Sequence, residues 1–309
     1  MVVTTEDEAP ILLRRRLLAA GYRDDEVRRM RRRRQAVPLR PGAYLTADDP
    51  RVRLPEDRHR ALVHAAIEQL GSDAVVSRVS AAVLHGLDVW AVPLGRVHLS
   101  RPGDGGGRRS RHLHRHVERL DAEQVVLVDG IAVTSVAETV CALARTEPFE
   151  QAVVVADSAL HRRRVTPDEL DAAVERAAGR PGVGAAARVV AFADRRSESP
   201  GESRSRVAMH RLGLPPPVLQ LPMRSARGEP LGRADFGWPD RGAVGEFDGL
   251  VKYGRLVRPG GSAADVVVAE KRREDAARDA GLRFVRWTWD ELAPFDRVAT
   301  RLRRALGLS

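Results

Sequence analysis

Cysteine is almost absent from this sequence, since Cys141 is the single one among 309 residues. One thiol cannot close an intramolecular disulfide, and without a CxxC pair there is no cysteine-based zinc or redox motif. Uninterrupted apolar runs fall short of the roughly 20 residues that cross a bilayer. The first ten residues also hold Glu6, Asp7 and Glu8, where a secretory signal would be basic and then apolar. We therefore expect a cytoplasmic protein with no membrane partner.

Lysine is nearly as scarce. Lys252 and Lys271 are the only lysines among 52 basic residues, so the other 50 are arginines, and with 42 acidic residues the net charge is +10. The planar guanidinium group binds phosphate through two hydrogen bonds and stacks on bases, so this surplus favours a nucleic-acid partner. A general preference for arginine and alanine in the source proteome explains the composition equally well.

Helical and strand periodicities alternate along the chain, which predicts a mixed α/β or α+β protein of more than one domain. Residues 1–50 read as a basic, winged-helix-like segment and residues 51–180 as a mixed α/β domain. A connecting helix is expected within residues 181–196. Residues 197–309 follow the order αβββαβα, with a long charged helix over residues 264–280. The sequence therefore predicts four segments, of which the last has the most regular pattern.

Local signals predict several element boundaries. The apolar and basic stretch 11–20 predicts the first helix, and a final helix is expected from residue 290 onward. Asp129-Gly130, between two runs of β-branched residues, predicts a hairpin, because this pair allows the positive φ of a type I′ turn. Capping boxes at residues 135–138 and 166–169 predict two helix starts.

Three acidic residues lie on two neighbouring strands of this last segment: Asp235 on one, and Glu246 and Asp248 on the next. Because side chains alternate across a strand, Glu246 and Asp248 share one face and Phe247 takes the other. If the phenylalanine faces the core, the carboxylates gather and repel one another unless a divalent cation binds. Oxygen ligands of this kind suit Mg²⁺ or Mn²⁺. A solvated face of an antiparallel hairpin is the alternative.

The αβββαβ order with an Asp and then Glu-x-Asp-Gly resembles the PD-(D/E)XK nuclease superfamily. More narrowly, residues 199–202, 234–236, 245–249, 270–275 and 284–287 look like the domain of unknown function related to very-short-patch-repair endonucleases. The resemblance implies a restriction-endonuclease-like fold in which Glu202, Asp235 and Glu246 bind Mg²⁺. There the ion would polarise a phosphate oxygen and activate the attacking water.

The sequence departs from the general superfamily motif at its third position, where Asp248 replaces the usual lysine, as it does in the narrower family. A carboxylate can bind metal or accept a proton, but it cannot stabilise the transition state as a cation would. Lys252, Lys271 or Arg273 could supply that cation from the following loop and helix. The alternative is a nuclease fold that is retained only for binding.

A second resemblance covers roughly the first 180 residues. The basic helix and residues 37–45 look like the helix and wing of a winged-helix domain, and residues 79–87 look like the next segment of AbiEi-type antitoxins of type IV toxin–antitoxin systems. The resemblance implies DNA binding, often at the protein's own promoter, and a cognate toxin as a partner. The residues expected to contact DNA are all arginines: Arg28, Arg31, Arg32, Arg33, Arg34 and Arg40. A solvated basic helix that packs through Leu17, Leu18, Val27 and Met30 is the alternative.

Three histidines, His112, His114 and His116, alternate in residues 111–117 and so share one face of a strand. The outer two are about 13 Å apart, which is too far for one ion with bonds of about 2.1 Å. We therefore expect a polar or phosphate-contacting face here and no metal. Arg286, in the apolar strand 282–288, either contacts DNA or pairs with a carboxylate.

These patterns predict a DNA-binding protein with a Mg²⁺-dependent endonuclease domain, in which Asp235, Glu246 and Asp248 are catalytic, with Lys252 or Arg273 as the supporting cation. The alternative is a non-enzymatic, antitoxin-like regulator that uses the nuclease fold for binding only.

Overall fold

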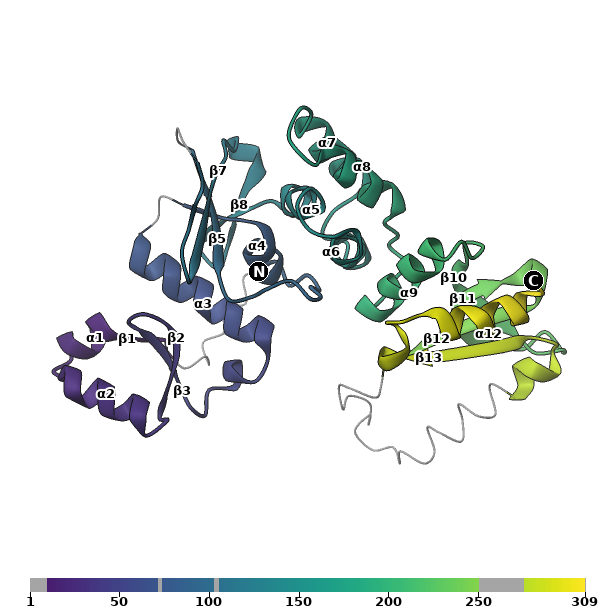
Figure 1. Cartoon of the computed structure of the whole chain (residues 1–309), viewed down its shortest axis with the longest axis horizontal. Helices are drawn as coiled ribbons and strands as arrows, with labels where there is room; N and C mark the ends of the chain where they lie inside the picture. The colour runs from purple at the N-terminus through teal and green to yellow at the C-terminus, as the bar shows by residue number, and fades with distance from the viewer. Residues whose placement is uncertain (1–9, 72–73, 103–105, 250–274, 309) are drawn as a thin grey trace. The chain divides into compact units, whose positions relative to one another are not determined.

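The computed structural model describes residues 10–71, 74–102, 106–249 and 275–308. The chain divides into two compact units. Unit 1 comprises Met1–Val155 with Arg164–Ala191, and unit 2 comprises Ala156–Arg163 with Phe192–Ser309. Helices and sheets are mixed in both units (Figure 1), which confirms the predicted mixed α/β class at this level. Within the described ranges, no helix combines the length and the apolar character that a membrane crossing requires.

The beginning of unit 1 is a small layer of two helices and three strands. The helices are α1 (Arg14–Ala19) and α2 (Asp24–Arg32), and the sheet has the order β1-β3-β2, from β1 (Leu12–Leu13), β3 (Ala43–Thr46) and β2 (Ala36–Arg40). The first helix was expected from residue 11 but begins at Arg14, because Leu12 and Leu13 pair with Tyr44 and Ala43 of β3. Acidic residues open α2 and arginines close it, as the helix dipole favours.

The larger sheet of unit 1 has six strands in the order β6-β7-β5-β4-β9-β8. Its strands are β4 (Val75–Val76), β5 (Val97–Arg101), β6 (Arg108–Arg109), β7 (Leu113–Val117), β8 (Val125–Val128) and β9 (Ile131–Thr134). β5 and β7 are parallel neighbours, although β6 and a loop separate them in the chain. The predicted β8–β9 hairpin is present, and Asp129 and Gly130 adopt the positive φ angles that its tight turn needs.

Helices lie between and after these strands, and residues 156–161 of the helix that begins at Phe149 belong to unit 2. They are α3 (Pro55–Leu70), α4 (Arg78–Leu84), α5 (Val136–Ala144), α6 (Phe149–His161), α7 (Pro167–Arg176) and α8 (Val183–Phe192). The predicted capping box is complete at α7, where Thr166 and Glu169 bond to each other's backbone amides. At α5 only the Ser135 half forms, because the side chain of Glu138 pairs with Arg176 instead.

Unit 2 contains a four-stranded sheet in the order β10-β11-β12-β13. Its elements are α9 (Pro200–Arg211), β10 (Val218–Arg224), β11 (Pro230–Trp238), β12 (Ala243–Asp248), β13 (Arg283–Thr288) and α12 (Asp296–Leu306). The first three strands form an antiparallel meander, and β13 runs parallel to β12. A helix is expected over residues 264–280, but most of that range lies outside the described residues. Within the described part, residues 275–279 are helical.

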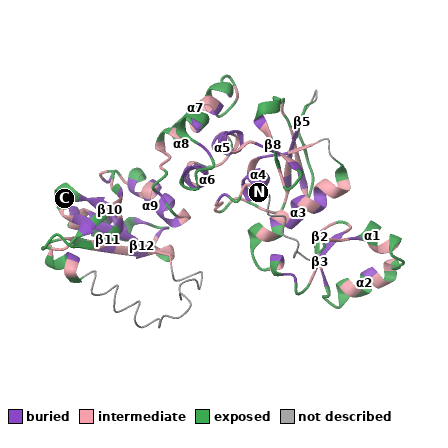
Figure 2. Cartoon of the chain, turned by 180° about the vertical axis from the view of Figure 1, so that it is seen from behind, coloured by how far each residue is buried: buried purple, intermediate pink, exposed green. Residues whose placement is uncertain are grey.

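The core of unit 2 joins α9 and α12 to the sheet through aromatic and aliphatic side chains. Phe236 and Trp287 stack with ring centroids 5.3 Å apart, and Phe295 meets Trp287 edge-on. Leu302 of α12 is fully buried against this cluster. The final helix was expected from residue 290, but Trp289–Glu291 form a short 3-10 turn and α12 begins at Asp296. Figure 2 shows this buried interior, in which most of β12 and the second half of β11 are buried, whereas β10 is more exposed.

Candidate functional site

The N-terminus of α9 holds the first predicted metal ligand, Glu202. Its side chain folds back on the helix start, accepting hydrogen bonds from the Ser199 hydroxyl at 2.7 Å and the Glu198 amide at 2.9 Å. Gln220 of β10 donates to the same carboxylate at 3.0 Å. Glu202 is 8% exposed, so its carboxylate lies inside unit 2, between α9 and the sheet.

Glu202 and Asp235 interact electrostatically. Burial, followed by the negative charge of Asp235, raises the pKa of Glu202 to about 7. Both effects disfavour the ionised form of a carboxyl group. The charge of a residue on β11 therefore acts on a buried carboxylate of α9 within unit 2.

Asp235 and Glu246 lie where β11 and β12 separate. The last paired residues of this ladder are Phe236 and Gly245. One position beyond them, the Asp235 carboxylate accepts a hydrogen bond from the Phe247 amide at 2.8 Å. The side chain of Asp235 thus replaces a ladder bond and holds the two strands apart at this point.

Glu246 lies opposite Arg286 on the parallel pair β12–β13. The Arg286 Nη2 and Nε atoms lie 2.8 and 2.9 Å from Glu246 Oε2. Of the two roles considered for Arg286, the structure therefore shows the ion pair with a carboxylate. Asp248 is half-buried and lies opposite Thr288 in the same ladder.

A glycine contact fixes how near α9 comes to the sheet. A Cβ atom built on Gly201 would overlap the ring of Phe247. Only a residue without a side chain allows this approach, and the next residue, Glu202, is thereby held against the sheet, where Gln220 of β10 contacts it. Sequence reasoning did not identify this role, since nothing in the linear pattern tells which strand faces the glycine.

The acidic residues fit Mg²⁺ in ligand type, because all are carboxylates. They are not yet arranged as a compact ligand set. In the described part of the chain, a group of three or more His, Cys, Asp or Glu ligand atoms within 4.8 Å of one another occurs only at His98, His114 and His116. The expected gathering of carboxylates is therefore not present as one ligand set, and Glu202, Asp235, Glu246 and Asp248 would have to move together to bind one ion.

Cations line the sheet edge near Glu246. A pocket of about 470 Å³ lies along β13 and α12. Its charged lining residues are Arg278, Arg283, Arg286, Arg301 and Arg304. We call this the arginine pocket. The other predicted cations, Lys252, Lys271 and Arg273, lie outside the described residues.

The predicted DNA-contacting arginines of α2 and the turn after it are exposed: Arg28, Arg31, Arg32, Arg33 and Arg34. The guanidinium carbon of Arg31 lies 5.8 Å from the ring centroid of Tyr44. Arg40 differs, since it is half-buried and its Nε and Nη1 atoms are buried without a partner in the described residues. Arg40 is thus not part of the exposed basic surface.

The histidine prediction was incomplete. His98 of β5 lies opposite His114 of β7, and together with His116 it forms a close group that excludes His112. The spacing argument along one strand remains valid for His112 and His116, but it overlooked the neighbouring strand. The signal was His98 between Val97 and Leu99 in a predicted strand, and the pairing of that strand could not be read from the sequence.

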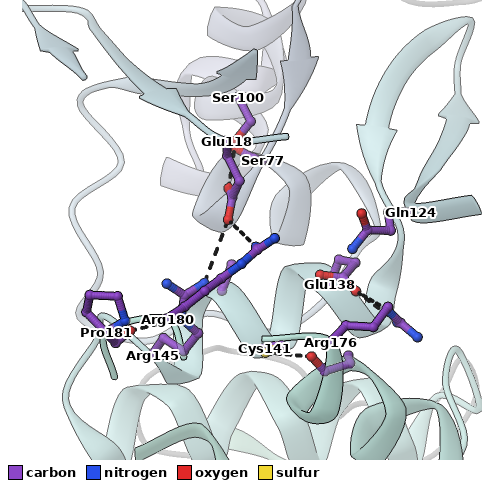
Figure 3. Close-up of polar contacts among 12 residues, drawn as sticks. Ser77, Ser100, Glu118, Gln124, Glu138, Cys141, Arg145, Arg176, Arg180 and Pro181 are labelled. Atoms are coloured by element: carbon purple, nitrogen blue, oxygen red, sulfur yellow. Dashed lines mark hydrogen bonds and ion pairs between the residues drawn. The ribbon is translucent and has the colours of Figure 1, made fainter. Parts of the chain in front are cut away.

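A network of arginines surrounds Glu118, just after β7 (Figure 3). Glu118 lies 3.1 Å from Arg180, 3.7 Å from Arg145 and 4.0 Å from Arg78. The Ser100 Oγ atom lies 2.8 Å from Ser77 Oγ and 3.3 Å from Glu118 Oε2, and its one proton can be donated to either. Burial raises the pKa of the nearby Cys141 thiol to about 11, so this cysteine is an unreactive core residue.

Comparison with known proteins gives relatives and no activity. No family model matches the chain. Uncharacterized protein Rv2248 and Uncharacterized protein MT2308, from the H37Rv and CDC 1551 strains of Mycobacterium tuberculosis, are each 30% identical to it over 218 residues, covering 66% of this chain and 78% of the relative. The chain belongs to the family of these mycobacterial proteins.

A solved structure is also similar in part. The crystal structure of the RV2827C protein from Mycobacterium tuberculosis aligns with a TM-score of 0.40 and 14% identity, over 64% of this chain and 76% of that chain. A similarity at this level carries no argument about fold or function. For this member of the family of Rv2248 and MT2308, the functional argument therefore rests on the site itself. Its chemistry combines buried acidic oxygens with neighbouring guanidinium groups.

Proposed function

We propose that this chain is a cytoplasmic DNA-binding protein whose unit 2 is a restriction-endonuclease-like domain that hydrolyses phosphodiester bonds with Mg²⁺ or Mn²⁺. The observation that carries the proposal is the electrostatic interaction between the buried Glu202 and Asp235. A buried carboxylate whose pKa is raised to about 7 by burial and a second carboxylate is a place where a dication replaces costly repulsion. Glu246, on the adjoining strand, would complete the oxygen ligands.

Each residue has a distinct role in this proposal. Glu202, Asp235 and Glu246 would hold the ion, which polarises a phosphate oxygen and lowers the pKa of a bound water. Asp248, two positions beyond Glu246 on the same strand face, would accept the proton of that water. Arg286 already lies against Glu246 and lines the arginine pocket, so it would bind a phosphate beside the cleaved bond.

The arginine pocket supports a polyanionic substrate. Five guanidinium groups line one pocket of about 470 Å³, and two of them, those of Arg286 and Arg301, pair with the carboxylates of Glu246 and Glu291. Guanidinium groups bind phosphate through paired hydrogen bonds, which gives both affinity and geometry. We infer that successive phosphates of a DNA strand lie along β13 and α12 while one of them faces the acidic residues.

Plasmid nicking by the full chain in MgCl₂ or MnCl₂ tests the hydrolytic proposal. Wild-type protein is expected to nick, and Asp235→Asn and Glu246→Gln are expected to lose the activity, with folding checked by circular dichroism. Glu229→Gln is the matched control, because Glu229 is an exposed acid in the same unit. Cleavage by both site variants at the wild-type rate, or none by wild type with either ion, would overturn the proposal.

A second candidate function is supported by the exposed arginines of α2. The chain would then be an antitoxin-like regulator, with a cognate toxin as partner, that binds DNA through a winged-helix-like segment and uses unit 2 for binding alone. Because each neutralised phosphate releases counterions, losing three phosphate contacts lowers the slope of log K against log salt by about 3. This test needs no catalytic activity.

Gel shifts at several salt concentrations, with DNA from upstream of the gene, test whether the exposed arginines of α2 and the turn after it bind DNA. Replacing Arg32, Arg33 and Arg34 by alanine is expected to weaken binding and flatten the salt dependence. The control replaces Arg162, Arg163 and Arg164, which are also exposed. Each set contains one residue at positive φ, Arg34 or Arg163, so the backbone cost is matched. Equal losses for the two sets would show a nonspecific charge effect.

A further inference from the structure

The histidine cluster of unit 1, defined as His98, His114 and His116, is built by two parallel strands. His98 lies opposite His114, and Ser100 lies opposite His116, in the β5–β7 ladder. Because neighbouring residues in register share a face and side chains alternate along a strand, the three imidazoles project to the same side. The arrangement belongs to the sheet itself and does not depend on a loop.

The rings are close enough to share one ligand. Their centroids lie 4.0 Å apart for His114 and His116, 5.1 Å for His98 and His114, and 5.2 Å for His98 and His116. The His98 Nδ1 and His116 Nε2 atoms are 3.1 Å apart. Two nitrogens bound at about 2.1 Å to a tetrahedral ion are separated by about 3.4 Å. The existing pair therefore already has nearly the spacing of two ligands.

The three imidazoles favour their neutral form. Burial, with charge repulsion from neighbouring rings and from Arg78, lowers the pKa of His98 and His116 to about 3 and also lowers the pKa of His114. Neutral imidazole is the form that binds a metal. His114 makes ring contacts but no hydrogen bond within the described residues, so its nitrogens are not committed to a protein partner there.

Two cations and an anion lie around the cluster. Arg109 of β6 is opposite His114, and Arg78, at the start of α4, acts on all three histidines. Glu118 partly balances Arg78, at 4.0 Å. A dication among neutral ligands and arginines needs a negative group nearby. The fourth coordination position is thus suited to hydroxide or to an oxygen of a small anion.

We propose that His98, His114 and His116 form a binding site for one divalent transition-metal ion, for which Zn²⁺ is the best fit. Three imidazoles suit zinc, and they do not suit Mg²⁺, which prefers oxygen. The site leaves one position open to water or a small anion. It lies in unit 1 and is independent of the acidic residues of unit 2.

Cobalt substitution tests this site directly. Full-length protein without an affinity tag is stripped with a chelator, dialysed and titrated with Co²⁺ while visible absorption is recorded. We expect the strong bands of four-coordinate Co²⁺ to saturate at one ion per chain and to be abolished by Zn²⁺ but not by excess Mg²⁺. X-ray absorption of the Zn²⁺ form is expected to show three imidazole ligands. No uptake, or a six-coordinate oxygen-ligand spectrum, would overturn the proposal.

Variants assign the binding to these residues. His114→Asn and His116→Asn are expected to weaken Zn²⁺ binding about 100-fold or more, since even outer-shell changes cost 10 to 100-fold. His112→Asn is the matched control, because His112 belongs to the same stretch but lies outside the cluster. Asp235→Asn changes an acidic residue of unit 2 and is expected to leave Zn²⁺ binding unchanged, which distinguishes the histidine cluster from the acidic residues. Unchanged Zn²⁺ affinity in a folded His114→Asn variant would contradict the assignment of the site to the histidine cluster. If a variant fails to fold, the Co²⁺ and X-ray absorption spectra of the wild-type protein test the proposal.

Discussion

His59, a buried histidine of unit 1, is expected to make the free energy of unfolding depend on pH. His59 is 1% exposed, with Nδ1 at 2.7 Å from the Leu94 carbonyl and Nε2 at 2.9 Å from the Ser80 hydroxyl. Ser80 in turn accepts the backbone amide of His98 at 2.9 Å. The neutral ring therefore helps to hold β5 in place, and protonation of His59 would turn Nε2 from an acceptor of the Ser80 proton into a donor.

We predict that the free energy of unfolding falls as the pH falls from about 6.5 towards 4. Burial lowers the pKa of His59 to about 4, so between these values the unfolded state binds a proton that the folded state does not. The loss is on the order of 3 kcal/mol for this residue. Urea titrations across this range measure it.

His59→Gln keeps a hydrogen-bonding side chain and is expected to reduce the pH slope by about one proton. His98 and His116 act in the same direction, so part of the slope remains. The exposed His161→Gln serves as the control. A His59→Gln variant with the full wild-type slope would contradict the prediction.

At the scale of elements, the contact between α9 and β12 determines whether the acidic residues meet. We predict that Gly201→Ala destabilises unit 2 by about 1–3 kcal/mol, because the added methyl group overlaps Phe247 and forces helix and strand apart. Denaturant unfolding measures the loss. Mg²⁺ affinity is expected to fall with it, since Glu202 moves away from Asp235.

Gly184→Ala is the matched control for this prediction. Gly184 lies inside α8, and a Cβ atom there would meet only the end of the Arg188 side chain, at 3.9 Å. Helix propensity then favours alanine by up to about 1 kcal/mol. Equal effects of the two substitutions would show that the close approach at Gly201 is unimportant.

Local signals predicted those elements whose cause lies within a few residues. The capping box at Thr166 and the Asp129-Gly130 turn formed as expected. The start of α1 was misplaced, because Leu12 and Leu13 were drawn into a ladder with residues some 30 positions away. Tertiary pairing outweighed helical periodicity there, and no local pattern records it.

The residues of the candidate sites also divide into those that a local pattern predicted and those whose partners depend on strand order. Asp235 and Glu246 could be placed on neighbouring strands from alternation alone, and the structure puts them beside the point where β11 and β12 part. The partner of Arg286 and the third histidine needed strand order, which the sequence does not state. His98 lies opposite His114 because β5 pairs with β7, although β6 lies between these two strands in the sequence.

At the scale of the whole molecule, the two units are expected to respond to different ions. Mg²⁺ should protect backbone amides of unit 2 around α9, β11 and β12, and Zn²⁺ should protect β5 and β7 of unit 1. At 100 times the dissociation constant, bound ligand adds about 2.7 kcal/mol against opening. Hydrogen exchange followed by mass spectrometry measures both responses in one sample of the full chain.

Two comparisons make this prediction specific. Glu202→Gln is expected to abolish the Mg²⁺ response alone, and His116→Asn the Zn²⁺ response alone. Protection of the same peptides by both ions would mean that neither site is selective.

The ion pair between Glu246 and Arg286 joins residues 40 positions apart in the chain. During translation at about 5–20 residues per second, β12 therefore leaves the ribosome some 2–8 s before its parallel neighbour. In that interval β12 has an open edge and Glu246 lacks the guanidinium group of Arg286. The acidic site that we propose is therefore incomplete in a newly made chain until the returning strand docks.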